Sequence, residues 1–272
     1  MISFSDDEGV TWRPLASFGL ILQPGHDHPF IPEIENSSGR IGGADGAIDF
    51  GGRLGVRPFK FPLCFPYETT VAAMQQRGRA LAAFLSDSRG RPRTVWLRFE
   101  YELDKYYAVR FNGQVIPTRR FETAAFELPL VAYDPYAYSI DSSTGITWDS
   151  LTSMDNDILT FEDGFEFTVL APGTMEVKNF GSLEVWPTIK LTGSFTSLSL
   201  SIGPRTLVYN EAVASGTVTI DCNKMQAKLN GSNKNNKVSG QWIKLLPGSN
   251  FVDITGTGLN CTVSFVFRAK YL

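Results

Sequence analysis

The stretch FELPLVAYDPYAY, Phe126–Tyr138, decides how this chain is divided. Four of its apolar residues fall on one face at period two: Phe126, Leu128, Leu130 and Ala132. This alternation predicts a half-buried β-strand, and the Asp134-Pro135 pair ends it because proline offers no N–H group to a β-ladder. Most of the arginines and the one convincing helix pattern precede this point, whereas short Ser/Thr/Gly-rich segments follow it. The sequence therefore predicts two domains, residues 1–138 and 139–272.

Length and composition fit two ordinary globular domains. The chain has 272 residues, of which 43% are hydrophobic and 19% charged, so each half is long enough to bury a core. The net charge of -3 argues against a dedicated nucleic-acid binder. No apolar run approaches the roughly 20 residues that a membrane span needs, and the N-terminus is acidic where a signal sequence would be basic. We therefore expect a soluble protein, made in a cytoplasm, without a membrane partner.

Cysteine and histidine usage indicates neither a disulfide framework nor a metal site. Cys64, Cys222 and Cys261 are far apart and odd in number, which is typical of reduced thiols, with a Cys222–Cys261 disulfide as the minor alternative. The only histidines, His26 and His28, lie in a proline-bounded stretch without a Cys-x-x-Cys motif nearby. We expect a polar surface loop there, and no metal or cofactor.

The first domain is predicted to combine β-strands with one helix. Ile2–Phe18 is expected to form a β-hairpin, and the glycine-rich stretch Gly19–Phe50 a loop-rich arm that can extend along a neighbouring subunit. The helix is predicted over residues 67–85, with Thr69 or Thr70 as its N-cap. One apolar face is expected from residues at 3, 4 spacing: Val71, Met74, Gly78, Leu81, Ala82 and Leu85. Strands are expected at 59–65, 94–99, 106–111 and 119–133.

The second domain reads as short strands of four to eight residues separated by turns rich in Gly, Asn and Pro. Strands at this spacing predict an antiparallel β-sandwich in which two sheets share one core. Its connections are too short to hold a helical layer.

Four local features follow one another along the chain in an order that resembles the siphophage distal tail proteins. They are the glycine-rich stretch leading to Arg57–Pro62 and the helix, Asp134–Tyr138 at the junction, Asn179-Phe180-Gly181 with Trp186–Gly193, and Asp221 followed by Leu245–Asn250. Each also has a plain structural reading as a turn or a strand end, so the resemblance rests on their joint order.

The resemblance implies a mainly β (α+β) fold. It implies an N-terminal, tail-tube-like β-sandwich or barrel with one helix, and a C-terminal galectin-like β-sandwich. It further implies a structural, non-enzymatic virion protein at the tail tip, assembled in the host cytoplasm as a hexameric ring. The implied partners are other copies of itself, the tail tube protein and a tail-associated lysin or fibre hub, with the genome passing through the ring and no specific nucleic-acid site.

One motif points elsewhere. The stretch SDDEGVTW, Ser5–Trp12, matches the Asp-box pattern Ser-x-Asp-x-Gly-x-Thr-Trp of sialidases and other propeller proteins. In those proteins the box is a structural hairpin that repeats from blade to blade, and here it occurs once. We therefore expect a stable hairpin turn and no sialidase-like enzyme.

No other catalytic pattern is present in the sequence. It contains neither a Gly-x-Ser-x-Gly elbow nor a phosphate-binding Gly-x-x-x-x-Gly-Lys-Ser/Thr loop. Glu100, Glu102 and Asp104 are expected on one side of a strand, where a cation site is the alternative to a solvated face. We expect no catalytic residues and no metal ligands.

Arginines crowd into the proposed ring domain and are candidates for contacts between subunits, because guanidinium groups suit carboxylates at interfaces. The candidates are Arg77, Arg79, Arg89, Arg91 and Arg93, with Arg98, Arg110, Arg119 and Arg120 nearby. The alternative is that they solvate one polar face.

A carbohydrate-binding module in host cell-wall recognition is the alternative function, because a β-sandwich can present aromatic side chains to a glycan. The candidates are Trp148, Trp186, Tyr209 and Trp242, with Trp148 as the contact of choice, since Trp186 and Trp242 lie in strand patterns and are expected to pack in the core.

Overall fold

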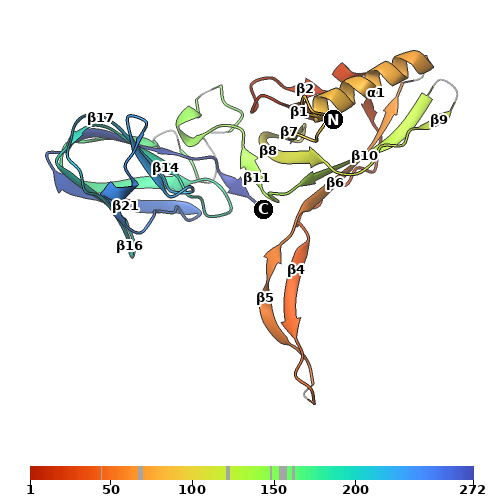
Figure 1. Cartoon of the computed structure of the whole chain (residues 1–272). Helices are drawn as coiled ribbons and strands as arrows, with labels where there is room; N and C mark the ends of the chain where they lie inside the picture. The colour runs from red at the N-terminus through yellow and green to blue at the C-terminus, as the bar shows by residue number, and fades with distance from the viewer. Residues whose placement is uncertain (44, 67–69, 121–122, 148, 153–157, 161–162) are drawn as a thin grey trace. The chain divides into compact units, whose positions relative to one another are not determined.

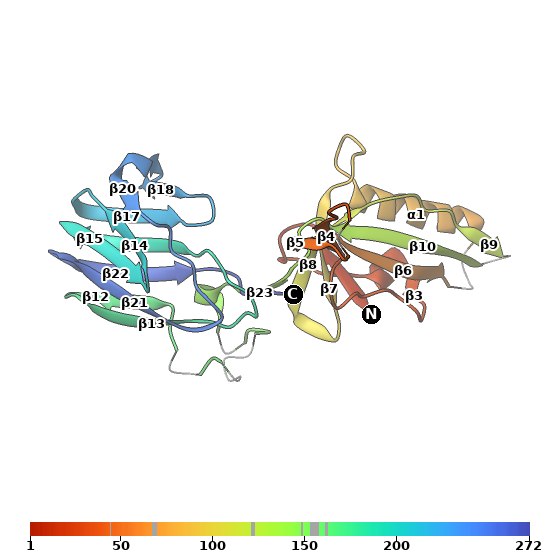
Figure 2. The same cartoon turned by 90° about the horizontal axis from the view of Figure 1, so that it is seen from below.

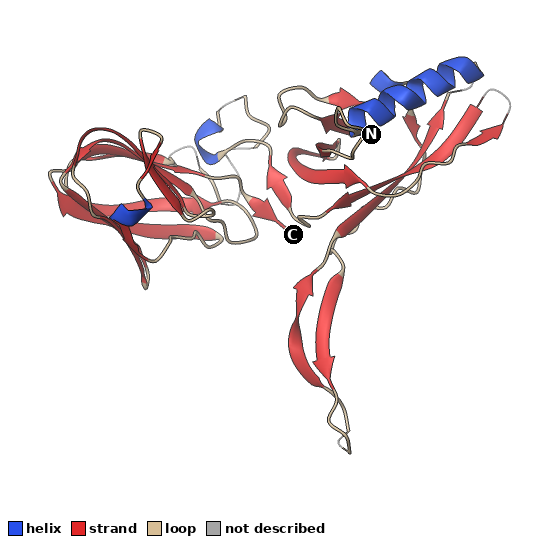
Figure 3. Cartoon of the chain, in the orientation of Figure 1, coloured by secondary structure: helices blue, strands red, loops and turns tan. Residues whose placement is uncertain are grey.

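The computed structural model describes every residue except 44, 67–69, 121–122, 148, 153–157 and 161–162. The described residues are mostly β-strands in several sheets, with one α-helix of 15 residues, as Figures 1 and 3 show. They divide into two compact units, Met1–Ala137 with Leu272 and Tyr138–Tyr271. Strand β11 (Ala137–Ser139), at this division, pairs with β23 (Lys270–Tyr271).

The first unit is built on an antiparallel sheet whose strands follow the order β2-β1-β7-β8-β10-β6-β3, with β9 paired to β10 (Figures 1 and 2). The strands are β1 (Ile2–Ser5), β2 (Arg13–Pro14), β3 (Ile21–Leu22), β6 (Arg57–Phe65), β7 (Thr94–Phe99), β8 (Glu102–Phe111), β9 (Thr118–Arg120) and β10 (Thr123–Ala132). A short 3-10 helix, η1 (Leu15–Phe18), follows β2. Two further strands, β4 (Ile34–Gly39) and β5 (Ile48–Leu54), form a separate two-stranded sheet.

Strand β10 has the alternating burial that the sequence predicts. Phe126, Leu128, Leu130 and Ala132 are all buried, and the strand ends at Ala132, before the Asp-Pro pair. It pairs with β6 along nine consecutive positions, so that Leu128 lies opposite Phe61 and Leu130 opposite Phe59. The expected single strand over residues 119–133 is wrong, because the chain reverses between β9 and β10, which pair through Arg120 and Thr123.

Helix α1 (Val71–Leu85) begins four residues later than predicted. The Thr70 side chain caps it by accepting a hydrogen bond from the N–H of Ala73 at 3.2 Å, while Thr69 lies outside the described residues. Its buried residues are Met74, Leu81, Phe84 and Leu85, whereas Val71 and Ala82 of the predicted face are exposed. The face is rotated because the Phe84 ring packs against Phe4 and Phe18 from β1 and η1.

The Asp-box sequence forms the turn of the β1–β2 hairpin, as predicted. The Asp7 carboxylate accepts hydrogen bonds from the Thr11 N–H at 2.8 Å and the Ser5 hydroxyl at 2.7 Å. These bonds, that to the Thr11 N–H foremost, lower the pKa of Asp7 to about 2. The residues of the Asp-box motif therefore stabilise the turn of one hairpin.

The second unit is an antiparallel β-sandwich with two sheets, in the orders β12-β22-β14-β17-β18-β19 and β13-β21-β15-β16-β20. Both sheets contribute to one core, in which the side chains of Leu191 and Leu200 are fully buried. The strands are β12 (Glu166–Val169), β13 (Gly173–Asn179), β14 (Thr188–Phe195), β15 (Ser197–Ile202), β16 (Arg205–Tyr209), β17 (Val213–Asp221), β18 (Gln226–Leu229), β19 (Ser232–Asn233), β20 (Val238–Gly240), β21 (Gly248–Thr257) and β22 (Asn260–Val266). Short 3-10 helices occur at η2 (Ser143–Gly145) and η3 (Asn235–Lys237).

The Asn179-Phe180-Gly181 motif forms a turn, as its sequence suggests. Asn179 is fully buried; its amide donates to the carbonyl oxygens of Leu183 at 2.8 Å and Leu245 at 3.3 Å. Its side-chain oxygen accepts the N–H of Gly181 at 3.0 Å. The motif therefore satisfies buried backbone groups of the fold.

We expect two separable unfolding transitions, because each unit has its own buried core. Leu128→Ala in the first unit and Leu200→Ala in the second each leave a cavity, which should cost about 2–5 kcal/mol. Calorimetry of the two variants should show one lowered transition each, a different one in each variant. A single transition lowered equally by both would show that the units unfold together.

Candidate self-association surface

Strands β4 and β5 form a hairpin, residues 34–54, which we call the arm (Figure 1). The glycine-rich sequence predicts a loop-rich arm here, whereas the structure forms paired strands. Almost every residue of the two strands is exposed. The arm therefore contributes little to the core of its own chain.

Both faces of the arm carry exposed apolar side chains. Ile34 lies directly opposite Leu54 on one face, whereas the register shifts between Asn36 and Ser38, so that Ile48, opposite Gly39, lies with Phe50 on the other face. Ile34, Ile48 and Phe50 are exposed by 52%, 45% and 67%. The face with Ile48 and Phe50 also carries the ion pair between Glu35 and Arg53, at 2.7 Å. Strands whose apolar side chains remain open to water are typical of a surface that another chain covers.

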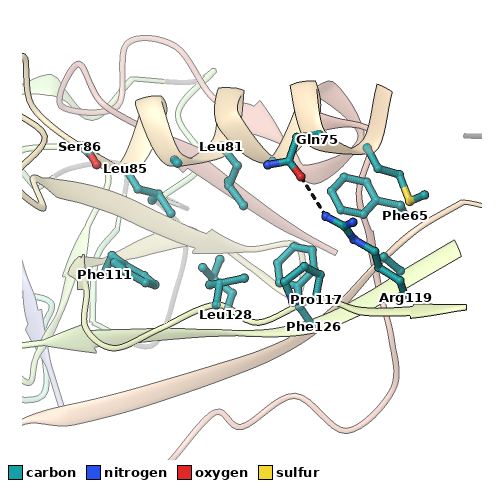
Figure 4. Close-up of a pocket in the computed structure, with 15 residues that line it drawn as sticks. Phe65, Gln75, Leu81, Leu85, Ser86, Phe111, Pro117, Arg119, Phe126 and Leu128 are labelled. Atoms are coloured by element: carbon teal, nitrogen blue, oxygen red, sulfur yellow. Dashed lines mark hydrogen bonds between the residues drawn. The ribbon is translucent and has the colours of Figure 1, made fainter. Parts of the chain in front are cut away.

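A groove of about 290 Å³ lies between α1 and β10 (Figure 4). Its walls are mainly apolar, with Phe65, Leu81, Phe111, Phe126 and Leu128 among the side chains that line it. Apart from its two chain neighbours and the backbone of the helix itself, no atom lies within 4 Å of the position that a Cβ atom would take on Gly78, so there is space beside the helix there. At one end, the Arg119 guanidinium donates a hydrogen bond to the Gln75 side chain at 3.0 Å.

The candidate arginines fall into two groups. Arg77 donates to the Gly19 carbonyl at 3.4 Å, and Arg93 pairs with Asp6 at 2.8 Å and stacks over the Phe84 ring, so both are engaged within their own chain. Arg79, Arg89 and Arg91 are exposed. Because they are exposed, these three arginines remain candidates for contacts between subunits.

The neighbouring arginines also have contacts within the chain. Arg98 lies over the Trp12 ring, and Arg110 donates to the Pro92 carbonyl at 2.8 Å. Arg119 lines the groove, and the side chain of Arg120 lies outside the described residues.

His28 lies in an aromatic cluster at the start of the segment that leads to the arm, and the expectation of a plain polar surface loop is wrong for it. Its ring stacks on Phe99 with 4.2 Å between centroids. Its two nitrogens contact the hydroxyl groups of Tyr101 at 2.7 Å and Tyr107 at 3.0 Å. Burial, followed by the charges of Arg57 and His26, lowers the pKa of His28 to about 4. The folded chain therefore holds this imidazole neutral at pH 7.

Arg57 completes this cluster at the base of the arm. It is only 1% exposed, lies over the Tyr107 ring at 5.2 Å, and donates to the Phe30 carbonyl at 3.5 Å. Through this hydrogen bond, Arg57 in β6, which follows the arm, holds the segment around Phe30, which precedes it. Period-two spacing in β6 places Arg57 on the buried face, but no local pattern indicates its partners, which are distant in the chain.

The acidic residues at the β7–β8 turn form ion pairs. Glu100 lies in the turn region before β8 and pairs with the N-terminal amine at 3.0 Å, whereas Lys105 pairs with Asp104 at 3.1 Å. No group of three or more candidate metal ligands occurs among the described residues. All three cysteines are unpaired.

The glycan candidates have structural roles where they are described. Trp186 and Trp242 are half-buried against the core, Arg205 lies over the Trp186 ring and donates to the Trp242 carbonyl, and Tyr209 is fully buried. Trp148 lies outside the described residues. The described part of the chain therefore offers no observation in favour of the carbohydrate-binding alternative. It also has no helix that is both long and apolar enough to span a membrane.

Two family models match the chain, one in each unit. Residues 13–132 match a phage tail protein RIFT-related domain, and residues 180–271 match a siphovirus-type tail component, C-terminal domain. No curated protein sequence matches the chain.

Solved structures match over the whole chain. One is the Dit protein (gp 19.1) of phage SPP1, described as a paradigm of the hub adsorption apparatus in phages that infect Gram-positive bacteria. It shares 18% identity with a TM-score of 0.72, and the match covers 100% of both chains, which shows a common fold. A chain of the activated, Ca-bound phage P2 baseplate matches less well, at 10% identity and a TM-score of 0.49 over 99% of this chain and 98% of that one.

The first unit should lose stability as the pH falls. Because the pKa of His28 in the folded chain, about 4, lies below its ordinary value of 6.5, the unfolded chain binds the proton first. Stability attributable to His28 is therefore fully present above pH 6.5 and declines towards pH 4. The His28→Gln variant, which cannot take up this proton, should show a shallower fall in Tm over this window. Equal slopes for the two proteins would contradict the assignment.

Proposed function

Because this chain is a siphophage distal tail protein, a family of phage tail hub and baseplate components, we propose that it assembles into a hexameric ring that joins the tail tube to the host-adsorption apparatus. The observation that carries the ring is the arm, whose apolar side chains are not covered by its own chain. A surface of this kind on a tail component fits association with further copies.

The structural arrangement supports a ring more than a two-fold dimer. The arm and the exposed arginines Arg79, Arg89 and Arg91 are different surfaces of one chain, and contacts between unlike surfaces are heterologous. Heterologous contacts close into rings when the rotation between copies allows it. The role is structural and without catalysis, an assignment that rests on family membership.

The proposed partners follow from the same membership. They are the tail tube protein on one side of the ring and a tail-associated lysin or fibre hub protein on the other. The genome would pass through the central opening without a specific binding site, since strong attraction to phosphates would impede its passage. The protein would act at the tail tip of the virion, after assembly in the host cytoplasm.

Light scattering over a range of concentrations, with negative-stain images of the same sample, tests this proposal. We expect particles of six or twelve copies with a central hole. A chain that stays monomeric at every concentration and also with its tail partners present would contradict it.

Charge reversal should weaken the ring. Arg89→Glu with Arg91→Glu places two like charges where we expect acidic residues of a neighbour, so the concentration for half-assembly should rise about tenfold. The matched control, Lys190→Glu with Lys224→Glu, changes the net charge equally on exposed residues of the second unit. Equal assembly of both variants and the wild type would remove Arg89 and Arg91 from the interface.

A further inference from the structure

The groove between α1 and β10 is long and narrow. Its lining residues run along the helix from Met74 to Ser86, about 18 Å at 1.5 Å per residue. Along the strand they run from Ala124 to Leu128, about 13 Å at 3.3 Å per residue. Spread over this length, the volume of about 290 Å³ leaves a mean cross-section of only about 16–22 Å². A groove of these proportions holds one extended chain of atoms, without room for a second chain beside it.

The chemistry of the walls favours a hydrocarbon chain. Leu81 and Leu85 point from the helix towards the strand, and Phe126 and Leu128 line the opposite side (Figure 4). Methylene groups that displace water from such walls gain the free energy of apolar burial. A polypeptide backbone is a poor occupant, because its N–H and C=O groups would leave water for walls that offer few hydrogen-bond partners.

One end of the groove is cationic. Of the fifteen described residues that line it, only three have polar side chains: Gln75, Ser86 and Arg119. Arg119 donates to the Gln75 side-chain oxygen at 3.0 Å, and this neutral acceptor leaves the guanidinium charge unbalanced. Both residues are exposed, so an anionic head group can reach them while it remains in contact with water. Ser86, at the far end, is uncharged. The groove therefore suits a ligand with an apolar tail and one negative end.

We propose that this groove binds one free single-chain amphiphile with an anionic head, of the class of a fatty acid carboxylate. The carboxylate lies at Arg119, with the Gln75 amide nitrogen as a second donor, and the hydrocarbon chain runs between α1 and β10 towards Leu85. A phospholipid with two acyl chains is excluded by the cross-section. The site lies within the first unit and does not depend on the proposed ring.

Calorimetric titration of the full chain with dodecanoate tests the proposal. We expect saturable binding of one molecule per chain, about tenfold weaker for each two carbons removed in decanoate and octanoate. Dodecyltrimethylammonium, with the same tail and a cationic head, should bind at least about tenfold more weakly than dodecanoate. Equal binding of the two head groups, or an absence of saturable binding by dodecanoate, would overturn the proposal.

Two variants of the helix locate the tail. Gly78→Leu places a side chain in the open space of the groove and replaces a poor helix former, so the chain should fold and bind dodecanoate at least about tenfold more weakly. Ala83→Leu adds a leucine at an exposed position of α1 that does not line the groove, and should leave binding unchanged. Equal affinities of the two variants would overturn the proposal.

A third variant locates the head group. Arg119→Gln should remove the preference for dodecanoate over dodecyltrimethylammonium and keep the dependence on chain length, because only the charge at the mouth changes. An unchanged preference would overturn the placement of the carboxylate.

Photolabelling shows the site directly. A dodecanoic acid with a diazirine near its methyl end should label residues 78–86 or 111–128, and labels that map only elsewhere would overturn the proposal. Vesicles of phosphatidylglycerol distinguish a free amphiphile from a membrane lipid. They should bind the wild type and Gly78→Leu equally, because paired acyl chains do not enter the groove. Vesicle binding that Gly78→Leu abolishes, in a chain that does not bind dodecanoate, would overturn the proposal in favour of a membrane surface.

Discussion

The pairing of β10 with β6 is the interaction on which the first unit depends. Nine consecutive residue pairs bring two alternating apolar faces into register, and Leu128 and Leu130 meet Phe61 and Phe59 on the buried side. A slip of one residue would turn both faces to solvent, so the apolar pattern fixes the register. Helix α1 then covers part of this face through Leu81 and Leu85 and leaves the rest as the groove.

The same pairing sets the base of the arm. Strand β6 begins at Arg57, three residues after the arm ends, and Arg57 lies opposite the small residue Ala132 on the buried side. Its guanidinium reaches the Phe30 carbonyl and the Tyr107 ring, next to His28. The base of the arm is thereby held by a buried polar and aromatic cluster, whereas the arm itself has no core. A segment with a fixed base and uncovered apolar side chains is suited to bind a second chain.

Features that depend on residues close together in the chain could be predicted from the sequence. The alternation in Phe126–Ala132, the stop at Asp134-Pro135, the Asp-box turn and the Thr70 cap all follow from local chemistry, and the order of motifs indicated the family. Features that need distant partners were not readable. Phe84 is buried because Phe4 and Phe18 lie there, Arg93 is engaged by Asp6, and His28 stacks on Phe99. The arm was expected as a loop because it is rich in glycine, and the register shift of the β4–β5 pair breaks the alternation that would indicate a strand.

Hydrogen exchange in the assembled and dissociated protein tests the central claim most directly, since that claim is that a second copy completes the surface of the first unit. The account predicts that the amides of residues 34–54 slow on assembly, because exchange reports local opening and burial. Assembly that leaves the amides of the arm exchanging as fast as in the free chain would contradict it.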